Sequence, residues 1–380
     1  MYPALAVLKA LQEGDGFSDK PSQPVDHTTF DGHEIEILWI GGIGGMEADL
    51  VKRENIPFIA IPAAGVHGVG LRALPGNIRQ IGQGYFAARQ IIHRFNPDVM
   101  FFTGGYVAVP VAFAGRLSGS REQRPTNVLY VPDIEPGLAL KVLSWLADRI
   151  ALTVEESMIY FSNHSKLTVS GYPTREGLHA WSLDEARKIF DLSPEYPTLL
   201  VFGGSKGARS INQALLRILP QILRDTQVIH ISGHLDWADV ESAKRSLDAM
   251  MQQRYHTYPY LHTEMGAALR AANLVVSRAG ASVLGEYPLF GLPAILVPYP
   301  HAWRYQEVNA RYLEERGAAI VLADEDLDAQ LLPTIRGLLG DSNRREMMRQ
   351  AIQGLARPEA AQSIAHLLYE LAEAHSQRGN

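Results

Sequence analysis

The residues best suited to chemistry surround a turn of small residues at 278–281. This turn follows an apolar strand and is expected to open a helix over 282–290, with Ser282 as its cap. Backbone N–H groups at such a helix start favour an anion. Glu286 lies one helical turn beyond Ser282 and could accept hydrogen bonds from a sugar diol, while Gln306 could offer an amide to a hexose. We interpret the set as a nucleotide-sugar pocket; the alternative is an ordinary βαβ unit whose glycines only make turns.

A second glycine-rich turn, GGSKGAR at 203–209, joins an apolar strand at 198–202 to a helix at 210–219. Ser205 can donate to a phosphate, and two cations lie close to it in the sequence. The turn has neither the GxxxxGK[ST] spacing of a P-loop nor the GxGxxG of a dinucleotide-binding fold, so neither ATP nor NAD is indicated. A related run, GGIGG at 41–45, has no basic residue and is interpreted as a structural turn.

Two carboxylates, Asp133 and Glu135, lie in a PDIEPG loop after a strand expected at 127–131. Because active-site groups of open α/β sheets gather at the carboxyl ends of strands, either could be a general base or position an acceptor hydroxyl. We assign Asp133 as the catalytic candidate and interpret Glu135 as a solvated turn residue. The thirteen histidines contain no HxH or HExxH pair, so we expect no metal site, and we expect no cofactor.

The elements that position these residues are expected to form two α/β halves. The chain has 380 residues, which is too long for one typical core. We expect an N-terminal domain at 1–170, a C-terminal domain at 171–355 that binds the nucleotide sugar, and a terminal helix at 356–380 that packs back on the first domain. Strands alternate with helices, which predicts doubly wound parallel sheets.

The composition excludes several classes of protein. A hydrophobic content of 46% with 20% charged residues is typical of globular proteins. The net charge of −6 gives no support for a nucleic-acid partner. The absence of cysteine excludes disulfides and thiolate metal sites. Because no apolar run reaches the length of a membrane span and no signal peptide is visible, we expect the chain to be cytoplasmic.

The chain starts on a helix, expected at 4–12, with no strand before it. Since a doubly wound domain starts on a strand, we expect the first strand and the first loop to be missing, as though the chain began at an internal methionine. The alternative is a fold that truly starts on this helix.

An amphipathic helix is expected at 77–95, after a half-apolar loop at 65–74. Arginines at positions 72, 79, 89 and 94 decorate this region. Apolar side chains flanked by arginines could dock on an anionic membrane surface or bind a lipid pyrophosphate. We favour this role for the loop. For the helix we favour an apolar stripe in the core with solvated arginines.

Several ordered blocks resemble the MurG branch of glycosyltransferase family 28. They cover nearly the whole chain and include WIGGIGGMEADLV, RFNPDVMFFTGGYVAVPV, VSGYPTR, LLVFGGSKGARSIN, SRAGASVLGE and GLPAILVP. The resemblance implies the GT-B fold, in which two Rossmann-like doubly wound domains face each other across a cleft. It also implies an inverting, metal-independent transfer of N-acetylglucosamine from UDP-GlcNAc to a lipid-linked acceptor, undecaprenyl-diphospho-muramoyl-pentapeptide, in peptidoglycan synthesis. The enzyme would be peripheral on the inner face of the cytoplasmic membrane.

The resemblance assigns roles on the donor side residue by residue. It implies that Ser205 contacts the diphosphate, that Arg175 helps at the nucleotide, and that Glu286 binds the ribose hydroxyls. The uracil edge would be held by the backbone of Leu261, or of His262 if the loop aligns differently. The residues that would face the phosphate and ribose are Ala281, Ser282, Val283, Leu284 and Gly285.

On the acceptor side the resemblance implies roles for Tyr106 and for the loop around His67, and it gives Gln306 the N-acetylglucosamine hydroxyls. The family's GGTGGH loop is absent from this chain, and its HEQN motif is replaced by YVPD, so that only Asp133 matches, at the Asn position. These departures leave two alternatives. The chain could be a glycosyltransferase of the same fold with a different lipid acceptor, or a catalytically inactive partner subunit that binds a nucleotide sugar.

Overall fold

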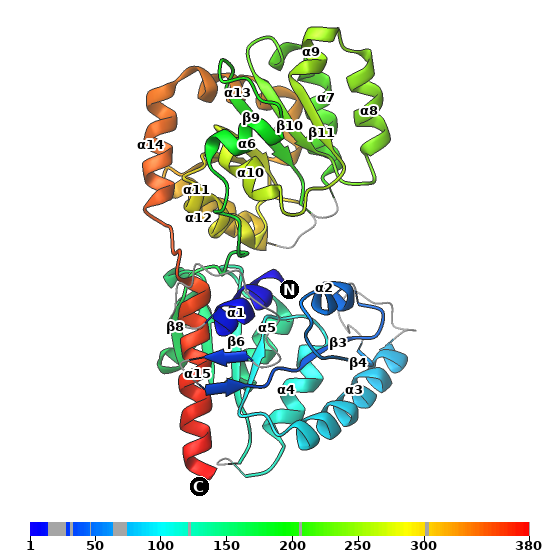
Figure 1. Cartoon of the computed structure of the whole chain (residues 1–380), viewed down its shortest axis with the longest axis vertical. Coiled ribbons are helices and arrows are strands. Elements are labelled where there is room, and N and C mark those ends of the chain that lie inside the picture. Colours follow the sequence, from blue (N-terminus) through cyan, green and yellow to red (C-terminus); the bar gives the residue numbers. More distant parts are fainter. Residues whose placement is uncertain are drawn as a thin grey trace. The chain divides into compact units, whose positions relative to one another are not determined.

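A computed structural model describes residues 1–13, 28–30, 33–45, 47–63, 74–120, 123–204, 207–300 and 304–379. The chain divides into two compact units (Figure 1). The N-terminal unit comprises Met1–Pro173 together with Glu359–Asn380, and the C-terminal unit comprises Thr174–Pro358.

The C-terminal unit is built on one six-stranded sheet, in which all neighbouring strands are parallel. The strand order is β11-β10-β9-β12-β13-β14. The strands are β9 (Thr198–Phe202), β10 (Gln227–Ile231), β11 (Tyr255–Tyr258), β12 (Leu274–Ser277), β13 (Ala294–Leu296) and β14 (Ala319–Val321). Their near-continuous apolar runs fit a sheet covered on both faces.

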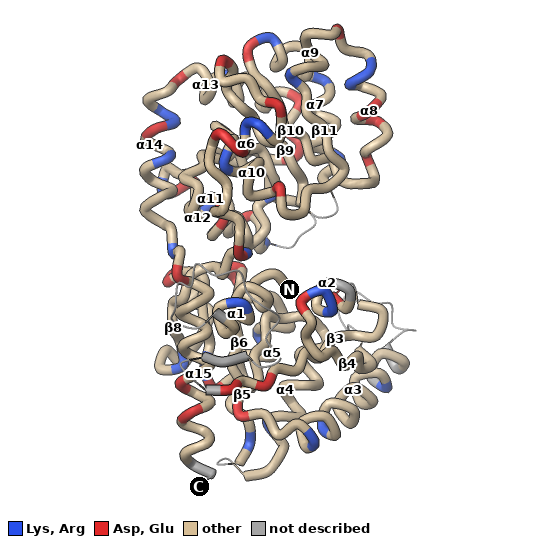
Figure 2. The backbone as a smooth tube through the Cα atoms, viewed as in Figure 1, with Lys and Arg blue, Asp and Glu red and all other residues tan. Residues whose placement is uncertain are grey.

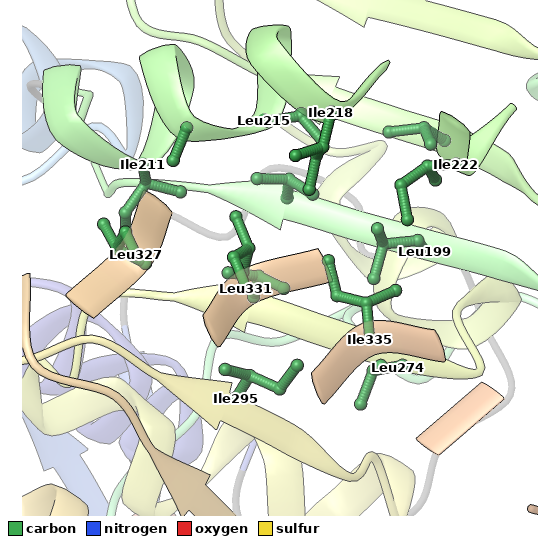
Figure 3. Close-up of a cluster of buried hydrophobic side chains, with 14 of the residues drawn as sticks. Leu199, Ile211, Leu215, Ile218, Ile222, Leu274, Ile295, Leu327, Leu331 and Ile335 are labelled. Atoms are coloured by element: carbon green, nitrogen blue, oxygen red, sulfur yellow. The ribbon is translucent and has the colours of Figure 1, made fainter. Parts of the chain in front are cut away.

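Helices α7 and α13 cover the same face of this sheet. Their buried leucines and isoleucines meet side chains from β9, β12 and β13 (Figure 3). Helix α10 packs against β9 and α6. The helices of the unit are α6 (Leu183–Ile189), α7 (Arg209–Ile222), α8 (Trp237–Ser246), α9 (Ala249–Gln253), α10 (Met265–Ala271), α11 (Glu286–Phe290), α12 (Tyr305–Glu315), α13 (Leu327–Gly340) and α14 (Ser342–Gln353), with 3-10 turns η3 (Ala281–Leu284) and η4 (Asp324–Asp326).

The N-terminal unit contains a four-stranded parallel sheet in the order β5-β6-β7-β8, and a parallel pair, β3-β4. A short antiparallel hairpin is formed by β1 and β2. The strands are β1 (Thr28–Phe30), β2 (His33–Ile35), β3 (Trp39–Gly42), β4 (Phe58–Ile61), β5 (Val99–Phe102), β6 (Thr126–Val131), β7 (Arg149–Leu152) and β8 (Leu167–Val169).

Helix α1 packs against α15 in this unit. His375 on α15 reaches the amino edge of the sheet, where its Nδ1 lies 2.8 Å from Asp98 Oδ1 and its Nε2 lies 3.1 Å from the Arg124 carbonyl. The helices are α1 (Tyr2–Glu13), α2 (Glu47–Arg53), α3 (Leu74–Phe95), α4 (Ala108–Arg116), α5 (Leu138–Leu146) and α15 (Ala360–Gly379), with 3-10 turns η1 (Glu155–Tyr160) and η2 (His164–Lys166).

Two elements differ in extent from what their sequence predicts. The run EIEILWI at 34–40 has the apolar pattern of a single strand, but it contributes to two strands, because β2 pairs antiparallel with β1 whereas β3 joins β4 in a parallel pair. The helix expected at 282–290 is a 3-10 turn, η3, followed by the short helix α11. Pro288 explains why the expected helix at 282–290 is interrupted, since Pro288 has no N–H to donate to the carbonyl of Leu284.

Candidate functional site

The carboxyl edge of the six-stranded sheet gathers most of the expected site residues. Strand β9 is followed in the chain by β10 on one side of it, whereas β12 pairs on its other side. In open α/β sheets ligands bind at such a change of direction, in the crevice outside the carboxyl ends of the strands. The loops after β9 and β12 therefore flank the expected ligand position.

Three positions of the loop after β9 require glycine. A Cβ on Gly203 would lie 2.2 Å from the Ala208 nitrogen, and one on Gly207 would lie 2.4 Å from the Ser232 carbonyl oxygen. Gly204 has a φ of +87°. Helix α7 begins directly after this loop, and its N-cap residue, Ala208, makes no side-chain cap. Amides at the start of α7 can therefore serve an anion. Ser205 and Lys206 lie outside the described residues.

The turn after β12 differs from the one expected. Gly280 is the N-cap of η3, so Ser282 lies inside the turn and does not cap a helix. Its side chain instead hydrogen-bonds Glu286, one turn further on. Val283 and Leu284 are buried in the core, so a ligand could meet only their backbone. Ala281 is half-buried and Gly285 is buried.

Glu286 is a buried carboxylate, with 7% of its surface exposed. Burial raises the pKa of its carboxyl, while Arg175 and the Ser282 hydrogen bond lower it. Arg175 Nη2 lies 3.9 Å from Glu286 Oε1. The structure thus brings together three expected site residues. A carboxylate held in this way can accept hydrogen bonds from paired hydroxyls, with a cation beside it for an anionic group.

Arg278, which the sequence analysis did not select as a site residue, ties together the loops at this edge. Its guanidinium donates to the carbonyls of Val297 and Pro298, to Asp324 and to the hydroxyl of Ser210 on α7. The loops after β12, β13 and β14 are thereby joined to the first turn of α7. The sequence around Arg278 does not indicate that its guanidinium joins these loops, because an arginine is equally compatible with an ordinary turn before a helix.

Gln306 lies near the start of α12, where its Oε1 accepts a hydrogen bond of 2.9 Å from the Tyr299 amide. This bond orients the amide, and its NH2 group has two hydrogens that can donate to a ligand. On the same helix, Asn309 Nδ2 donates to the Ala279 carbonyl at 3.2 Å, which joins α12 to the turn after β12. Leu261 is buried after β11, and the amide of His262 donates to Glu264, so the amide of His262 is already in use.

The expected acceptor-side residues lie in the N-terminal unit, after β5 and β6. Tyr106 is exposed and Asp133 is half-buried. Glu135, expected to be solvated, is buried, and its Oε1 lies 3.8 Å from Lys141 Nζ, so that interpretation is wrong. Thr153 holds the loop, since its hydroxyl donates to the Pro132 carbonyl at 2.9 Å. The sequence of a turn alone does not reveal whether the rest of the fold covers it.

Comparison with known proteins adds independent information. The model of the glycosyltransferase family 28 N-terminal domain matches residues 29–152, and that of the C-terminal domain matches residues 198–364. A protein of Roseiflexus sp. (strain RS-1) is 39% identical over 98% of this chain and 92% of its own length. One from Desulforamulus reducens is 36% identical over 96% and 93%. Both are named UDP-N-acetylglucosamine–N-acetylmuramyl-(pentapeptide) pyrophosphoryl-undecaprenol N-acetylglucosamine transferase.

Solved structures resemble the chain over nearly its full length. MurG of Acinetobacter baumannii has a TM-score of 0.68 and 26% identity, covering 97% of this chain and 95% of its own. A UDP-GlcNAc 2-epimerase from Neisseria meningitidis, solved with UDP-GlcNAc bound, has a TM-score of 0.66 at 11% identity, with coverage of 97% and 96%. The second likeness supports the fold alone.

The buried carboxyl of Glu286 generates a prediction about stability. Because its pKa is raised above the unfolded value of 4.5, the folded chain binds this proton more readily than the unfolded chain does. Its contribution to the free energy of unfolding therefore falls as the pH rises between those two values. Glu286→Gln should unfold at a higher temperature than the wild type at about pH 7, and the gain should vanish at about pH 4. Thermal unfolding of both proteins across this pH range tests the prediction. It would be contradicted if the unfolding temperature of Glu286→Gln, relative to that of the wild type, fell as the pH rose from about 4 to about 7.

Proposed function

The chain belongs to glycosyltransferase family 28, and we propose that it transfers N-acetylglucosamine from UDP-N-acetylglucosamine to N-acetylmuramyl-(pentapeptide) pyrophosphoryl-undecaprenol. Its fold is GT-B, with two Rossmann-like units. The observation that carries the proposal is the near-full-length identity of 34–39% to enzymes named for this reaction. The product is the lipid-linked disaccharide-peptide used in peptidoglycan synthesis.

The donor is bound by the C-terminal unit. The amides at the start of α7 and of η3 bind the diphosphate, with Ser205 donating from the loop. Glu286 accepts from the two ribose hydroxyls, and Arg175 offsets the charge of the nucleotide. Gln306 donates to a sugar hydroxyl and the backbone of Leu261 meets the uracil. What supports this arrangement is that these residues belong to one unit, and that Arg175 and Ser282 both contact the buried carboxylate of Glu286.

The transfer inverts the sugar. The acceptor hydroxyl attacks the anomeric carbon, its proton passes to Asp133, and the bond to the diphosphate oxygen breaks so that UDP leaves. Backbone amides and Arg175 stabilise the charge that develops on the leaving diphosphate. The half-buried position of Asp133 after β6 supports its role as the base, and Tyr106 after β5 is assigned to the acceptor. Both residues belong to the N-terminal unit.

A combined assay tests the reaction and the donor site. The purified chain should convert UDP-GlcNAc and the muramyl-pentapeptide lipid into the disaccharide product, and Glu286→Ala should weaken UDP-GlcNAc binding by about ten- to a hundredfold, because charge-assisted hydrogen bonds are lost. Glu185→Ala, which removes a carboxylate of the α6 capping box, is the control and should leave the affinity unchanged. Turnover with another lipid only would refute the acceptor. Unchanged affinity in Glu286→Ala by calorimetry would refute the pocket.

The chain acts at the inner face of the cytoplasmic membrane as a peripheral protein. No described helix combines the length and apolar character that a bilayer-spanning segment needs. The loop at 65–74, expected to dock, lies outside the described residues except for its last residue, Leu74, which begins α3. Helix α3 carries basic residues along its length (Figure 2). Phe86 on this helix and Leu117 after α4 are 63% and 61% exposed, and they line a cavity of about 710 Å³ together with Arg89 and His93. Apolar side chains beside cations suit an anionic lipid surface.

Co-sedimentation with vesicles tests this contact. The double variant Phe86→Ser/Leu117→Ser should bind vesicles of phosphatidylglycerol and phosphatidylcholine about tenfold more weakly than the wild type, because two side chains that enter the interface are lost. Leu235→Ser in the C-terminal unit, where Leu235 is 86% exposed, is the matched control and should bind as the wild type does. Equal loss in both variants, or no loss in either, would place the contact elsewhere.

A further inference from the structure

A line of buried polar side chains lies behind the glycine-rich loop of the C-terminal unit. His230 on β10 is completely buried. Its Nδ1 lies 2.7 Å from the hydroxyl of Tyr255 on β11, and its Nε2 lies 2.9 Å from Oδ1 of Asn212 on α7. The Nδ2 group of Asn212 donates to the Ser232 carbonyl and to Asp236 Oδ2, each at 2.8 Å. Every polar atom of the Asn212 side chain is therefore engaged.

The partners decide where the hydrogens lie. The Ser232 carbonyl and the Asp236 carboxylate only accept, so the NH2 group of Asn212 faces them and its oxygen faces His230. His230 Nε2 therefore carries the hydrogen, and its Nδ1 accepts from the Tyr255 hydroxyl. Burial lowers the pKa of His230 to about 3, which keeps the ring neutral in ordinary buffers. The line thus has one hydrogen-bond pattern.

This line ends at the backbone on which the glycine-rich loop packs. Gly207 comes so close to the Ser232 carbonyl that a Cβ would lie 2.4 Å from that oxygen. The Gly207 amide donates to the Gly204 carbonyl at 3.0 Å within the loop. The amide of Ser232 donates to the carbonyl of Tyr258 on β11 at 3.0 Å, so Ser232 is also held by that strand. Asn212 therefore joins the first turn of α7 to the peptide that limits the position of the loop.

We propose that Tyr255, His230, Asn212 and Asp236 are positioning residues, which set the backbone at Gly204 and Gly207 and the first turn of α7 to receive the nucleotide diphosphate. The proposal rests on the proposed function. The four side chains act through the backbone, because they hold the amides that face the phosphates. A small displacement of those amides weakens every hydrogen bond to the phosphates at once. The nucleoside is held by other elements, so its binding should not change.

Asn212→Asp is the sharpest variant, because it sets a second carboxylate against Asp236 and removes the donor to the Ser232 carbonyl. Gln227→Glu is its matched control. Gln227 is a buried amide at the amino end of β10, where its Nε2 donates to the carbonyls of Ser193 and Tyr196. Both variants exchange a buried amide for a carboxylate in the same unit, and both should lower the unfolding temperature. Only the first lies at the carboxyl edge.

Calorimetry with UDP and with uridine separates the two roles, at temperatures where each variant is folded. Asn212→Asp should lose about tenfold in UDP affinity, as for one lost charge-assisted hydrogen bond, with its uridine affinity unchanged. Gln227→Glu should keep both affinities. Asn212→Asp/Asp236→Asn, which restores a donor–acceptor pair between the two positions, should recover part of the loss. Equal ratios of UDP to uridine affinity in the wild type and in Asn212→Asp would overturn the proposal.

Amide hydrogen exchange without a ligand supplies a second readout, and Tyr255→Phe supplies a milder variant should Asn212→Asp fail to fold. Exchange in the segment 203–212 should rise in Tyr255→Phe and stay unchanged in Gln227→Glu. Unchanged exchange there in Tyr255→Phe would refute the positioning role even if UDP binds well. A wild type that binds no UDP would instead refute the proposed function, whatever the exchange data show.

Discussion

The candidate donor site depends on a loop whose glycines pack directly against the backbone of their neighbours. Gly203 and Gly207 approach backbone atoms so closely that any Cβ would collide with them. This close approach is what lets the chain leave β9 and enter α7 with its first amides uncapped by a side chain. Amides at such a helix start are suited to an anion. The other features of the carboxyl edge, from the Arg278 cluster to the buried line at His230, hold the surroundings of this loop in place.

Charged side chains are also buried at this carboxyl edge of the sheet, which costs free energy. Glu286 is removed from water, which raises its pKa, and Arg175 with Ser282 offset only part of that effect. The side chain of Arg278 is only 9% exposed, but its charge is matched by Asp324 and by the carbonyls that follow β13. A buried carboxylate whose charge is only partly offset by its neighbours is typical of functional sites, where a ligand can supply further hydrogen bonds. Structural ion pairs such as Arg124–Asp148 are instead closely paired.

Much of the fold could be predicted because apolar runs alternate with amphipathic segments, and parallel sheets covered on both faces produce that pattern. The ends of the helices and strands are harder to predict. The stretch at 34–40 reads as one strand, yet the chain changes sheets within it, and that depends on partners far along the sequence. Pro288 interrupts a helix that would start at Ser282, although Ser282 has the residue type of a cap. Ser282 therefore contacts Glu286, as its spacing suggested, without capping a helix.

The candidate site was predicted in part for similar reasons. Glu286 follows from residue type and spacing, and its contact with Arg175 required the fold. No sequence pattern selects His230, because motif spacing cannot show that a histidine inside a strand meets an asparagine from a neighbouring helix. The burial of Glu135 cannot be predicted from its turn sequence, because it is decided by packing around the loop and not by the loop itself. Buried polar networks are tertiary features, and they are the part that sequence patterns describe least.

The most direct test of the central claim is a crystal structure of the chain with UDP bound. We predict that the diphosphate lies against the amides of the loop at 203–208 and the first turn of α7, with a ribose hydroxyl within hydrogen-bond distance of Glu286 in the same nucleotide. A nucleotide bound away from this loop, or one that reaches the loop while Glu286 contacts none of it, would contradict the account.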